Sequence, residues 1–400
     1  MRTLLPRLGA GFNRLWTASA VSNLGDGLTM VAGPLLLASV TGNPILIAGG
    51  VFAQQLPWLL FSLLSGVFAD RLDRRRLIVA ANLGRAAALT VLTVAVGFGF
   101  ASVVLIYLVL FILGTGETLV DTAGGAMLPQ LVAPADLPRA NARLSATFTV
   151  ANQFAAKPLG AWLFGIAAAV PFGVDAVSFA VSAALIFSLP SPGVSSVMPR
   201  RSLRKDIAEG LRFLHGDRLL RTLAGAMGLG NIAFCTAFAV FVLYARHRLG
   251  VSDVGYGLLL TTFAIGGLLG AALASRVTSR FGAAAVLRTG LLVEILTHVV
   301  LATTTHAWVA GTVLILFGVQ TVVWGVITSS LRQRLVPNHL LGRVSSVYAL
   351  LETGGAAIGT LLGGVLAQTW GLTFPFWLAA AAMTAILAAA WTPIAQATRP

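Results

Sequence analysis

The chain has 400 residues, of which 57% are hydrophobic and only 10% are charged. A soluble domain carries about 25% charged residues, so this composition excludes the soluble globular, disordered and collagen-like classes. The single cysteine, Cys235, cannot form an intramolecular disulfide, which excludes a disulfide-rich secreted protein. A helical protein that crosses a membrane many times remains. In such a protein the formal net charge of +14 can report orientation.

Apolar runs separated by Arg, Pro and Gly predict twelve spanning helices. Each needs about 20 mainly apolar residues, and the hydrophobic content of the chain comes close to supplying twelve such segments. The spans predicted for the first half are 15–40, 44–68, 77–98, 101–125, 144–169 and 172–190. Those predicted for the second half are 220–245, 254–275, 283–303, 307–330, 344–369 and 372–391. The fold class is therefore an all-α polytopic membrane protein.

The basic residues indicate the orientation of these spans. Most of them fall in connections on one side of the membrane; Arg246 and Arg248 fall on the other side, and Lys157 falls within a span. Under the positive-inside rule this places both termini in the cytoplasm, as expected for a multi-pass protein of a bacterial inner membrane. Arg85 and Arg288 are predicted to lie within a few turns of the cytoplasmic face. The positive charge therefore does not indicate a nucleic-acid partner.

One long connection, 191–218, separates two halves. We expect an N-terminal six-helix bundle over 1–190 and a C-terminal one over 219–400. Within the connection, Ile207, Leu211 and Leu214 recur at helical spacing among charged residues. This pattern predicts an amphipathic helix that lies on the anionic inner leaflet of the membrane.

The two halves contain similar segments at equivalent loops. A-D-R-L-D-R-R at 69–75 aligns with A-S-R-V-T-S-R at 274–280, and each follows the second span of its half. L-V-A-P-A-D-L at 131–137 likewise aligns with L-V-P-N-H-L-L at 335–341, after the fourth span. Six-helix repeats that surround a central cavity are a transporter architecture.

The loop after the second span carries a family resemblance. G-V-F-A-D-R-L-D-R-R-R at 66–76 resembles the G-x-x-x-D-R-x-x-R-R signature of the major facilitator superfamily. Five further segments resemble the drug-efflux branch that includes macrolide exporters and the enterobactin exporter. They are S-N-L-G-D-G-L (22–28), A-N-L-G-R-A (81–86), A-M-L-P-Q-L-V (126–132), A-A-K-P-L-G-A (155–161) and P-F-G-V-D-A-V-S-F (171–179). The resemblance implies a proton-coupled exporter that works by alternating access.

The chain departs from that branch at two places. The fourth span reads L-G-T-G-E-T-L-V-D-T, where many drug–proton antiporters carry an Arg-bearing motif. In the fifth span Lys157 directly precedes Pro158, where a Gly-Pro pattern is expected.

The signature loop has the chemistry of a cytoplasmic gate. A glycine allows close approach of a neighbouring helix, and an aspartate can accept hydrogen bonds at a helix N-terminus in the other half. The remaining charges can form a network that bridges the two halves. The alternative is that the Arg run only anchors the topology. The residues of this predicted gate are Gly66, Asp70, Arg71, Asp73, Arg74 and Arg75.

A few ionisable residues lie inside the predicted spans, where an ionised group costs several kcal/mol unless it is paired or hydrated. We predict that Asp26, Glu117 and Lys157 couple transport to protons, with Lys157 paired to Asp26 or Glu117. The alternative is a fixed ion pair that only holds helices together. Asp121 and Glu352 are predicted to lie near the inner gate.

Three other buried candidates favour structural roles. Asp175 lies near the outer end of its span and is expected to cap or pair locally. Glu294 and His298 stand one turn apart on a predicted outer helix. We expect them to form a satisfied local pair, and a proton wire is the alternative.

Sparse polar side chains among aromatic ones predict a binding surface for a bulky amphipathic ligand. The predicted cavity residues are Asn23, Gln54, Gln55, Trp58, Gln153, Asn231, Phe234, Phe238, Gln320 and Trp324.

The sequence thus favours proton-coupled efflux of an amphipathic organic compound, such as a drug or secondary metabolite. Siderophore export or lysolipid flipping would need similar machinery. A non-transporting scaffold or receptor would need neither the buried charges nor the gate motif. No nucleophile–base pair, metal-ligand spacing or phosphate-binding loop indicates an enzyme or a cofactor. The expected partners are the small substrate, protons and membrane lipid, and we expect a monomer.

Overall fold

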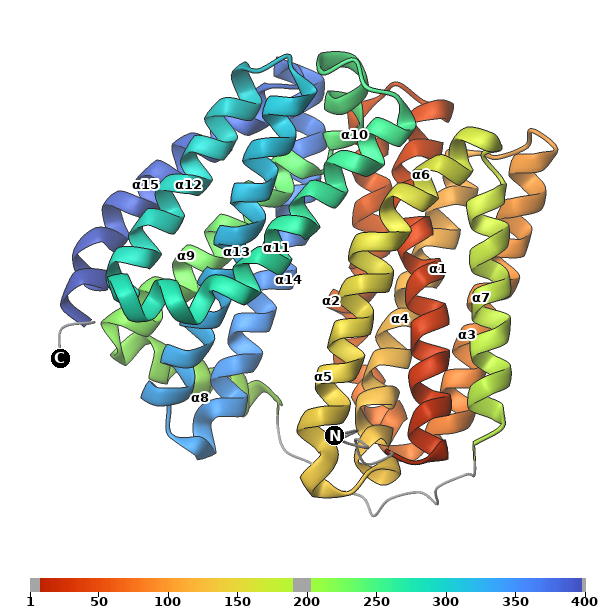
Figure 1. The fold of residues 1–400 in the computed structure, drawn as a ribbon, viewed down its shortest axis with the longest axis horizontal. Coiled ribbons are helices and arrows are strands. Elements are labelled where there is room, and N and C mark those ends of the chain that lie inside the picture. The colour runs from red at the N-terminus through yellow and green to blue at the C-terminus, as the bar shows by residue number, and fades with distance from the viewer. Residues whose placement is uncertain (1–7, 190–202, 398–400) are drawn as a thin grey trace, which may run out of the picture. The chain divides into compact units, whose positions relative to one another are not determined.

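The computed structural model describes residues 8–189 and 203–397, and within these ranges the regular structure is helical. The chain divides into two compact units (Figure 1). The first unit comprises Met1–Val40 and Ala53–Met198, and the second comprises Thr41–Phe52 and Pro199–Pro400. The beginning of the second helix therefore packs with the second unit, where Ala48 joins a buried cluster with Ala239, Val240 and Ala367.

The helices of the first half follow the predicted apolar runs. Two of them begin at side-chain caps: Asp73 accepts a hydrogen bond from the backbone N–H of Arg76, and Ser102 accepts one from Leu105. The helices are α1 (Ala10–Val40), α2 (Pro44–Arg71), α3 (Arg74–Gly97), α4 (Val103–Leu131), α5 (Leu137–Phe148), α6 (Ala156–Ile166) and α7 (Val170–Phe187). A π-helix, η2 (Thr149–Ala155), joins α5 to α6.

The second half begins with an amphipathic helix and continues with long apolar ones. Asp217 and Ser252 cap the helices that follow them. The helices are α8 (Leu203–Gly216), α9 (Arg218–Phe238), α10 (Phe241–Leu243), α11 (Asp253–Phe281), α12 (Ala283–Thr303), α13 (Ala307–Leu335), α14 (Asn338–Trp370) and α15 (Phe374–Ala397). A π-helix, η3 (Tyr244–Arg248), follows α10.

In the described part of the chain, eleven helices are long and apolar enough to cross a membrane. The all-α polytopic fold is therefore confirmed. The remaining predicted span, 144–169, corresponds to the helical run from Leu137 to Ile166, which η2 divides into shorter pieces. A π-helix inserts extra residues into the turn and often marks a functional site. Here Asn152 of η2 donates a hydrogen bond to the backbone oxygen of Asn23, 3.0 Å away on α1.

The two units pack their helices in the same order. In the first unit α7 packs against α1 and α3, and α3 packs against α4. In the second unit α15 packs against α9 and α12, and α12 packs against α13. Each of these pairings in one unit thus has its equivalent in the other, as a repeat would produce.

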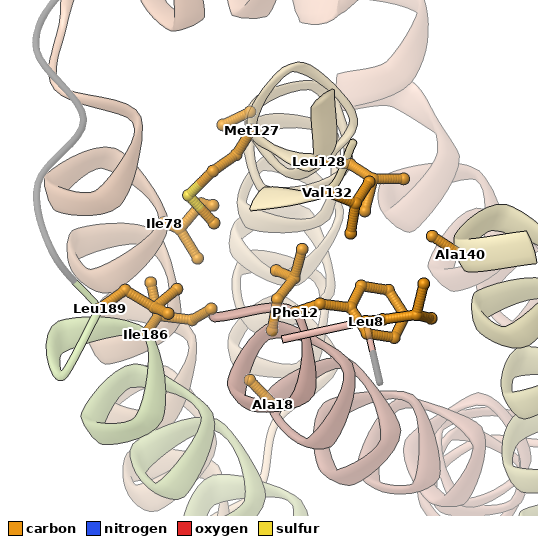
Figure 2. Close-up of a cluster of buried hydrophobic side chains, with 12 residues drawn as sticks. Leu8, Phe12, Ala18, Ile78, Met127, Leu128, Val132, Ala140, Ile186 and Leu189 are labelled. Carbon is orange, nitrogen blue, oxygen red and sulfur yellow. The ribbon is translucent and has the colours of Figure 1, made fainter. Parts of the chain in front are cut away.

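A buried apolar cluster fills one end of the first unit (Figure 2). It lies where α1 begins and where α4 and α7 end, around the fully buried ring of Phe12. The Arg143 guanidinium lies 3.9 Å from the centre of the Trp16 ring, on the border of this cluster. Apolar side chains of α1, α3, α4 and α7 therefore hold this end of the bundle together.

Helix α8 packs against protein on one face. Leu214 is buried in a cluster with Val344 and Val347 of α14, and Glu209 makes an ion pair with Arg343 at 2.6 Å. Leu211 remains exposed, and the side chain of Ile207 lies outside the described residues. The predicted lipid contact of this apolar face is therefore wrong for Leu214, because spacing identifies an apolar face without identifying what covers it.

Candidate functional site

The first unit contains a cavity of about 390 Å³ lined by α1, α3, α4, α5, α7 and η2. We call it the first-unit cavity. Its lining includes Asn23, Asp26, Arg85, Glu117 and Asp121. Most of the charged groups that lie deep in the helices of this unit therefore meet at one cavity.

The central contact of this cavity is an ion pair. The Arg85 guanidinium of α3 donates a hydrogen bond to Asp26 of α1, and only 2% of Arg85 is exposed. On its other side, the guanidinium lies 3.7 Å from the centre of the Phe179 ring of α7. A Cβ atom at Gly116 of α4 would lie 2.5 Å from Cδ of Arg85. Residues of α1, α4 and α7 thus surround the buried guanidinium of Arg85.

This pairing corrects one prediction. Lys157 pairs with neither Asp26 nor Glu117: its ammonium group donates a hydrogen bond to Gln153 at 2.6 Å. Arg85 stands eleven residues into α3, about three turns along the helix from Arg74, which agrees with its predicted depth. Helical spacing gives the face of one helix, but it cannot show which basic residue faces α1.

Two further carboxylates lie on the same cavity from α4. Glu117 accepts a hydrogen bond from Trp58 of α2. Asp121 follows one turn later and is exposed. The structure thus brings Asp26, Glu117 and Asp121 together. The assignment of Asp121 to an inner gate stays a prediction.

Asp175 is fully buried between α1 and α7. Its carboxylate accepts hydrogen bonds from the hydroxyl of Thr29 at 2.5 Å and from that of Ser178 at 3.0 Å. Gly25 provides the space, because a Cβ atom there would lie 2.1 Å from the Asp175 carboxylate. Asp175 is therefore a satisfied structural group that joins two helices.

The signature loop makes local contacts within the first unit. Asp73 caps α3, Arg74 donates a hydrogen bond to the backbone oxygen of Ala126 at 2.8 Å, and Arg75 lies 4.6 Å from the centre of the Phe187 ring. Arg71 is exposed. The surroundings of Gly66 and the side chain of Asp70 lie outside what the structure describes. The gating role of the motif stays a prediction.

The second unit contains its own cavity of about 490 Å³, which we call the second-unit cavity. Four predicted binding residues line it: Asn231, Phe234, Gln320 and Trp324. Glu352 also lines it, and the side-chain amide of Asn231 donates a hydrogen bond to the Glu352 backbone oxygen.

The other predicted binding residues lie apart from these two cavities. Phe238 stacks on Phe234 with ring centres 4.4 Å apart, behind the lining. The remaining ones that line neither cavity are Gln54, Gln55, Trp58 and Gln153.

Sequence reasoning missed Glu294 as a cavity residue. Glu294 stands on α12, which was expected to be an outer helix, yet its side chain lines the second-unit cavity. The predicted side-chain pair with His298 is wrong, because Nδ1 of His298 bonds the backbone oxygen of Glu294 at 2.8 Å. The signal in the sequence is Gly290, one turn earlier. It lets Gln320 and Trp324 of α13 approach α12 closely enough for Glu294 to reach the cavity.

Comparisons with known proteins agree with this architecture. Residues 3–397 match the model of the transmembrane secretion effector family. The chain is 29% identical over 378 residues to the multidrug efflux pump Tap of Mycolicibacterium fortuitum, covering 90% of each protein. It is 25% identical to macrolide efflux protein A of Streptococcus pyogenes, over 65% of this chain and 64% of that protein. It is 26% identical to the enterobactin exporter EntS of Salmonella typhimurium, over 88% of this chain and 85% of that protein.

Solved structures show the same fold. A bacterial homologue of the iron transporter ferroportin, in an inward-facing state, superposes with a TM-score of 0.80. The match covers 97% of this chain and 100% of the other, at 18% sequence identity. These relatives and fold neighbours are transporters and not enzymes. The chain therefore belongs to the transmembrane secretion effector family of the major facilitator superfamily, as the loop motif and the flanking segments predict.

Proposed function

We propose that this transporter exports amphipathic organic compounds in exchange for protons. The observation that carries the proposal is the ion pair between Arg85 and Asp26 at the wall of the first-unit cavity. A buried ion pair contributes little net stability, and ionisable groups within membrane spans commonly serve transport. An ion pair that also meets a cavity is accessible to protons and to substrate.

The coupling follows from the chemistry of the pair. Proton uptake by Asp26 removes the negative partner of Arg85 and leaves the guanidinium to the other carboxylates of the cavity. Glu117, which lines the same cavity, is the second coupling candidate. Lys157 does not pair with either carboxylate, so its place in the proposal is to hold Gln153. Release of the proton restores the ion pair, and the cycle can repeat.

Two observations support an amphipathic organic substrate. The second-unit cavity presents a few polar groups among aromatic rings, which suits a bulky ligand with a polar part. The relatives are named for efflux of multiple drugs, for efflux of macrolides and for export of enterobactin. Export from the cytoplasm across the inner membrane is the direction that these names support.

The test is proton release from the purified full-length chain in detergent, measured with a pH-sensitive dye while erythromycin is added. The wild-type protein should release protons on addition of substrate. The Asp26→Asn variant should release none at that step, because the amide keeps the shape but cannot carry the proton. Glu209→Gln removes a carboxylate that pairs with Arg343 on the surface and should behave as wild type. Substrate-driven release that persists in Asp26→Asn would refute the assignment.

A further inference from the structure

Glu294 is a buried carboxylate of the second-unit cavity, which Arg332 also lines. Glu294 is 9% exposed and makes no ion pair with any residue in the described ranges. His298, one turn away, contacts its backbone and not its carboxylate. Nε2 of His298 is buried and has no hydrogen-bond partner among the described residues. A desolvated carboxylate is costly unless a positive group meets it, so the environment of Glu294 favours a cationic ligand.

Aromatic rings line the same cavity as this carboxylate. Phe234, Phe263 and Phe317 all line the cavity. The ring centre of Phe317 lies 5.5 Å from that of Phe234 and 5.5 Å from that of Phe263. The faces of aromatic rings attract cations, and the attraction grows when water is excluded. A cavity that combines a carboxylate with an aromatic cluster therefore favours a positively charged apolar group over a neutral or negative one.

The remaining polar groups fit an organic cation and not a bare metal ion. Gln320 is 8% exposed, and its carbonyl oxygen accepts a hydrogen bond from Thr321 at 3.3 Å. No group of three or more metal-ligating side chains occurs in the described part of the chain. A few charged and amide side chains in about 490 Å³ are typical of a site that orients a bulky ligand.

Two other charged residues line the cavity, Arg332 and Glu352. The Arg332 guanidinium lies 4.7 Å from the centre of the Tyr348 ring, and its Nε has no hydrogen-bond partner among the described residues. Glu352 is exposed, whereas Glu294 is buried. Arg332 and Glu352 stand nearer the ends of α13 and α14 that carry the basic residues. Glu294 is therefore the buried charge that this cavity offers to a ligand.

We propose that the second-unit cavity is a binding site for lipophilic organic cations, in which Glu294 meets the positive group and the rings of Phe234, Phe263 and Phe317 hold its substituents. This deepens the proposed function by naming the charge of the substrate. The proposal depends on the proposed export function only in so far as the bound cation is also transported. Binding itself requires neither proton coupling nor an intact Asp26.

The test uses two ions of the same shape and opposite charge, tetraphenylphosphonium and tetraphenylborate. Equilibrium binding of each is measured to the purified full-length chain in detergent. The wild type should bind the cation with saturation and bind the anion at least about tenfold more weakly, because the carboxylate and the ring faces both oppose negative charge. Glu294→Gln should lose about tenfold or more in cation affinity. Glu294→Asp, which keeps the charge, should retain part of it.

Matched variants separate this site from the rest of the protein. Glu209→Gln makes the same chemical change on the surface and should leave cation affinity unchanged, and a gel-filtration profile checks that each variant is folded. Asp26→Asn should still bind the cation even if it releases no protons, so a failure of proton coupling is distinguishable from a failure of this site. Wild type that binds no cation, or Glu294→Gln that binds it as well as wild type, would overturn the proposal.

Discussion

At Gly116, a hydrogen atom in place of a side chain makes room for the buried charge of the first unit. The position faces Cδ and Cγ of Arg85, which a Cβ atom would approach to 2.5 and 2.6 Å. Contacts below 3 Å are sterically forbidden, so a larger residue must displace the arginine. The ion pair with Asp26 therefore depends on a residue that carries no charge and makes no hydrogen bond through a side chain.

We expect Gly116→Ala to destabilise the protein by about 1–3 kcal/mol, the usual cost of overpacking a filled site. The measurement is the melting temperature of the purified protein. Gly124→Ala, on the same helix, adds a methyl group where nothing lies within 4 Å. That variant should be neutral or slightly stabilised, because alanine favours a helix more than glycine does. Equal melting temperatures for the two variants would show that Arg85 adjusts freely.

The sequence predicts which charged residues lie within the spans, but it does not predict which of them pair across helices. The position of Asp26 and Glu117 within apolar spans predicts that they are functional charges, and the structure brings both to one cavity with Asp121. The sequence analysis names Lys157 as their cationic partner, whereas Arg85 is the residue that pairs with Asp26. Periodicity gives the face of one helix and not the face that opposes it.

At the scale of helices, small residues determine how closely elements pack. A Cβ atom at Gly266 of α11 would lie 2.0 Å from the backbone oxygen of Ile315, and one at Gly318 of α13 would lie 2.1 Å from that of Phe263. The two helices therefore touch backbone to backbone, as small residues permit in membrane proteins. This contact fixes the positions of Phe263 and Phe317, which line the same cavity as Glu294.

Gly266→Ala should separate α11 from α13, because a backbone oxygen cannot move aside as a flexible side chain can. We expect a loss of stability of more than about 1 kcal/mol and weaker binding of tetraphenylphosphonium. Gly267→Ala is the neighbouring control, since its Cβ atom would make an ordinary contact of 3.5 Å with Val322. Both are measured by melting temperature and by equilibrium binding. A tolerated Gly266→Ala beside an equally tolerated Gly267→Ala would argue against a tight interface.

The elements themselves were largely predictable, and their interruptions were not. Long apolar runs bounded by Arg, Pro and Gly gave most spans within a few residues of helices such as α12 (Ala283–Thr303). The π-helix at Thr149–Ala155 has no comparable signal in the sequence, because its residues are compatible with an ordinary α-helix. The packing of Leu214 against α14 was not predicted either, because an amphipathic pattern does not show whether lipid or protein covers its apolar face.

At the scale of the whole molecule, equivalent helices of the two units each carry a buried charge, and the two charges have opposite signs. The third long helix of the first unit, α3, contributes Arg85 to a cavity, and the corresponding helix of the second unit, α12, contributes Glu294 to another. Arg85 pairs with a carboxylate of its own unit, whereas Glu294 makes no ion pair among the described residues. This difference underlies the two proposals, proton exchange at the first unit and binding of a cationic ligand at the second.

The distribution of basic residues makes a prediction for the whole chain in its membrane. Arg276 and Arg280 end α11 near the Gly282 turn, which the positive-inside rule places in the cytoplasm. The turn between α12 and α13, which contains Thr305, should then face outside. Cys235 is the single cysteine of the chain, so Cys235→Ser gives a background for placing new ones.

On that background we expect Thr305→Cys to react with a membrane-impermeant maleimide in intact cells. Ser279→Cys should react only after the cells are permeabilised, since both positions are exposed and differ only in the side they face. Cys235→Ser alone, unlabelled in both conditions, is the control for background reaction. Labelling of Ser279→Cys in intact cells would reverse the orientation. The charge of +14 would then lie outside, against the rule that assigned the topology.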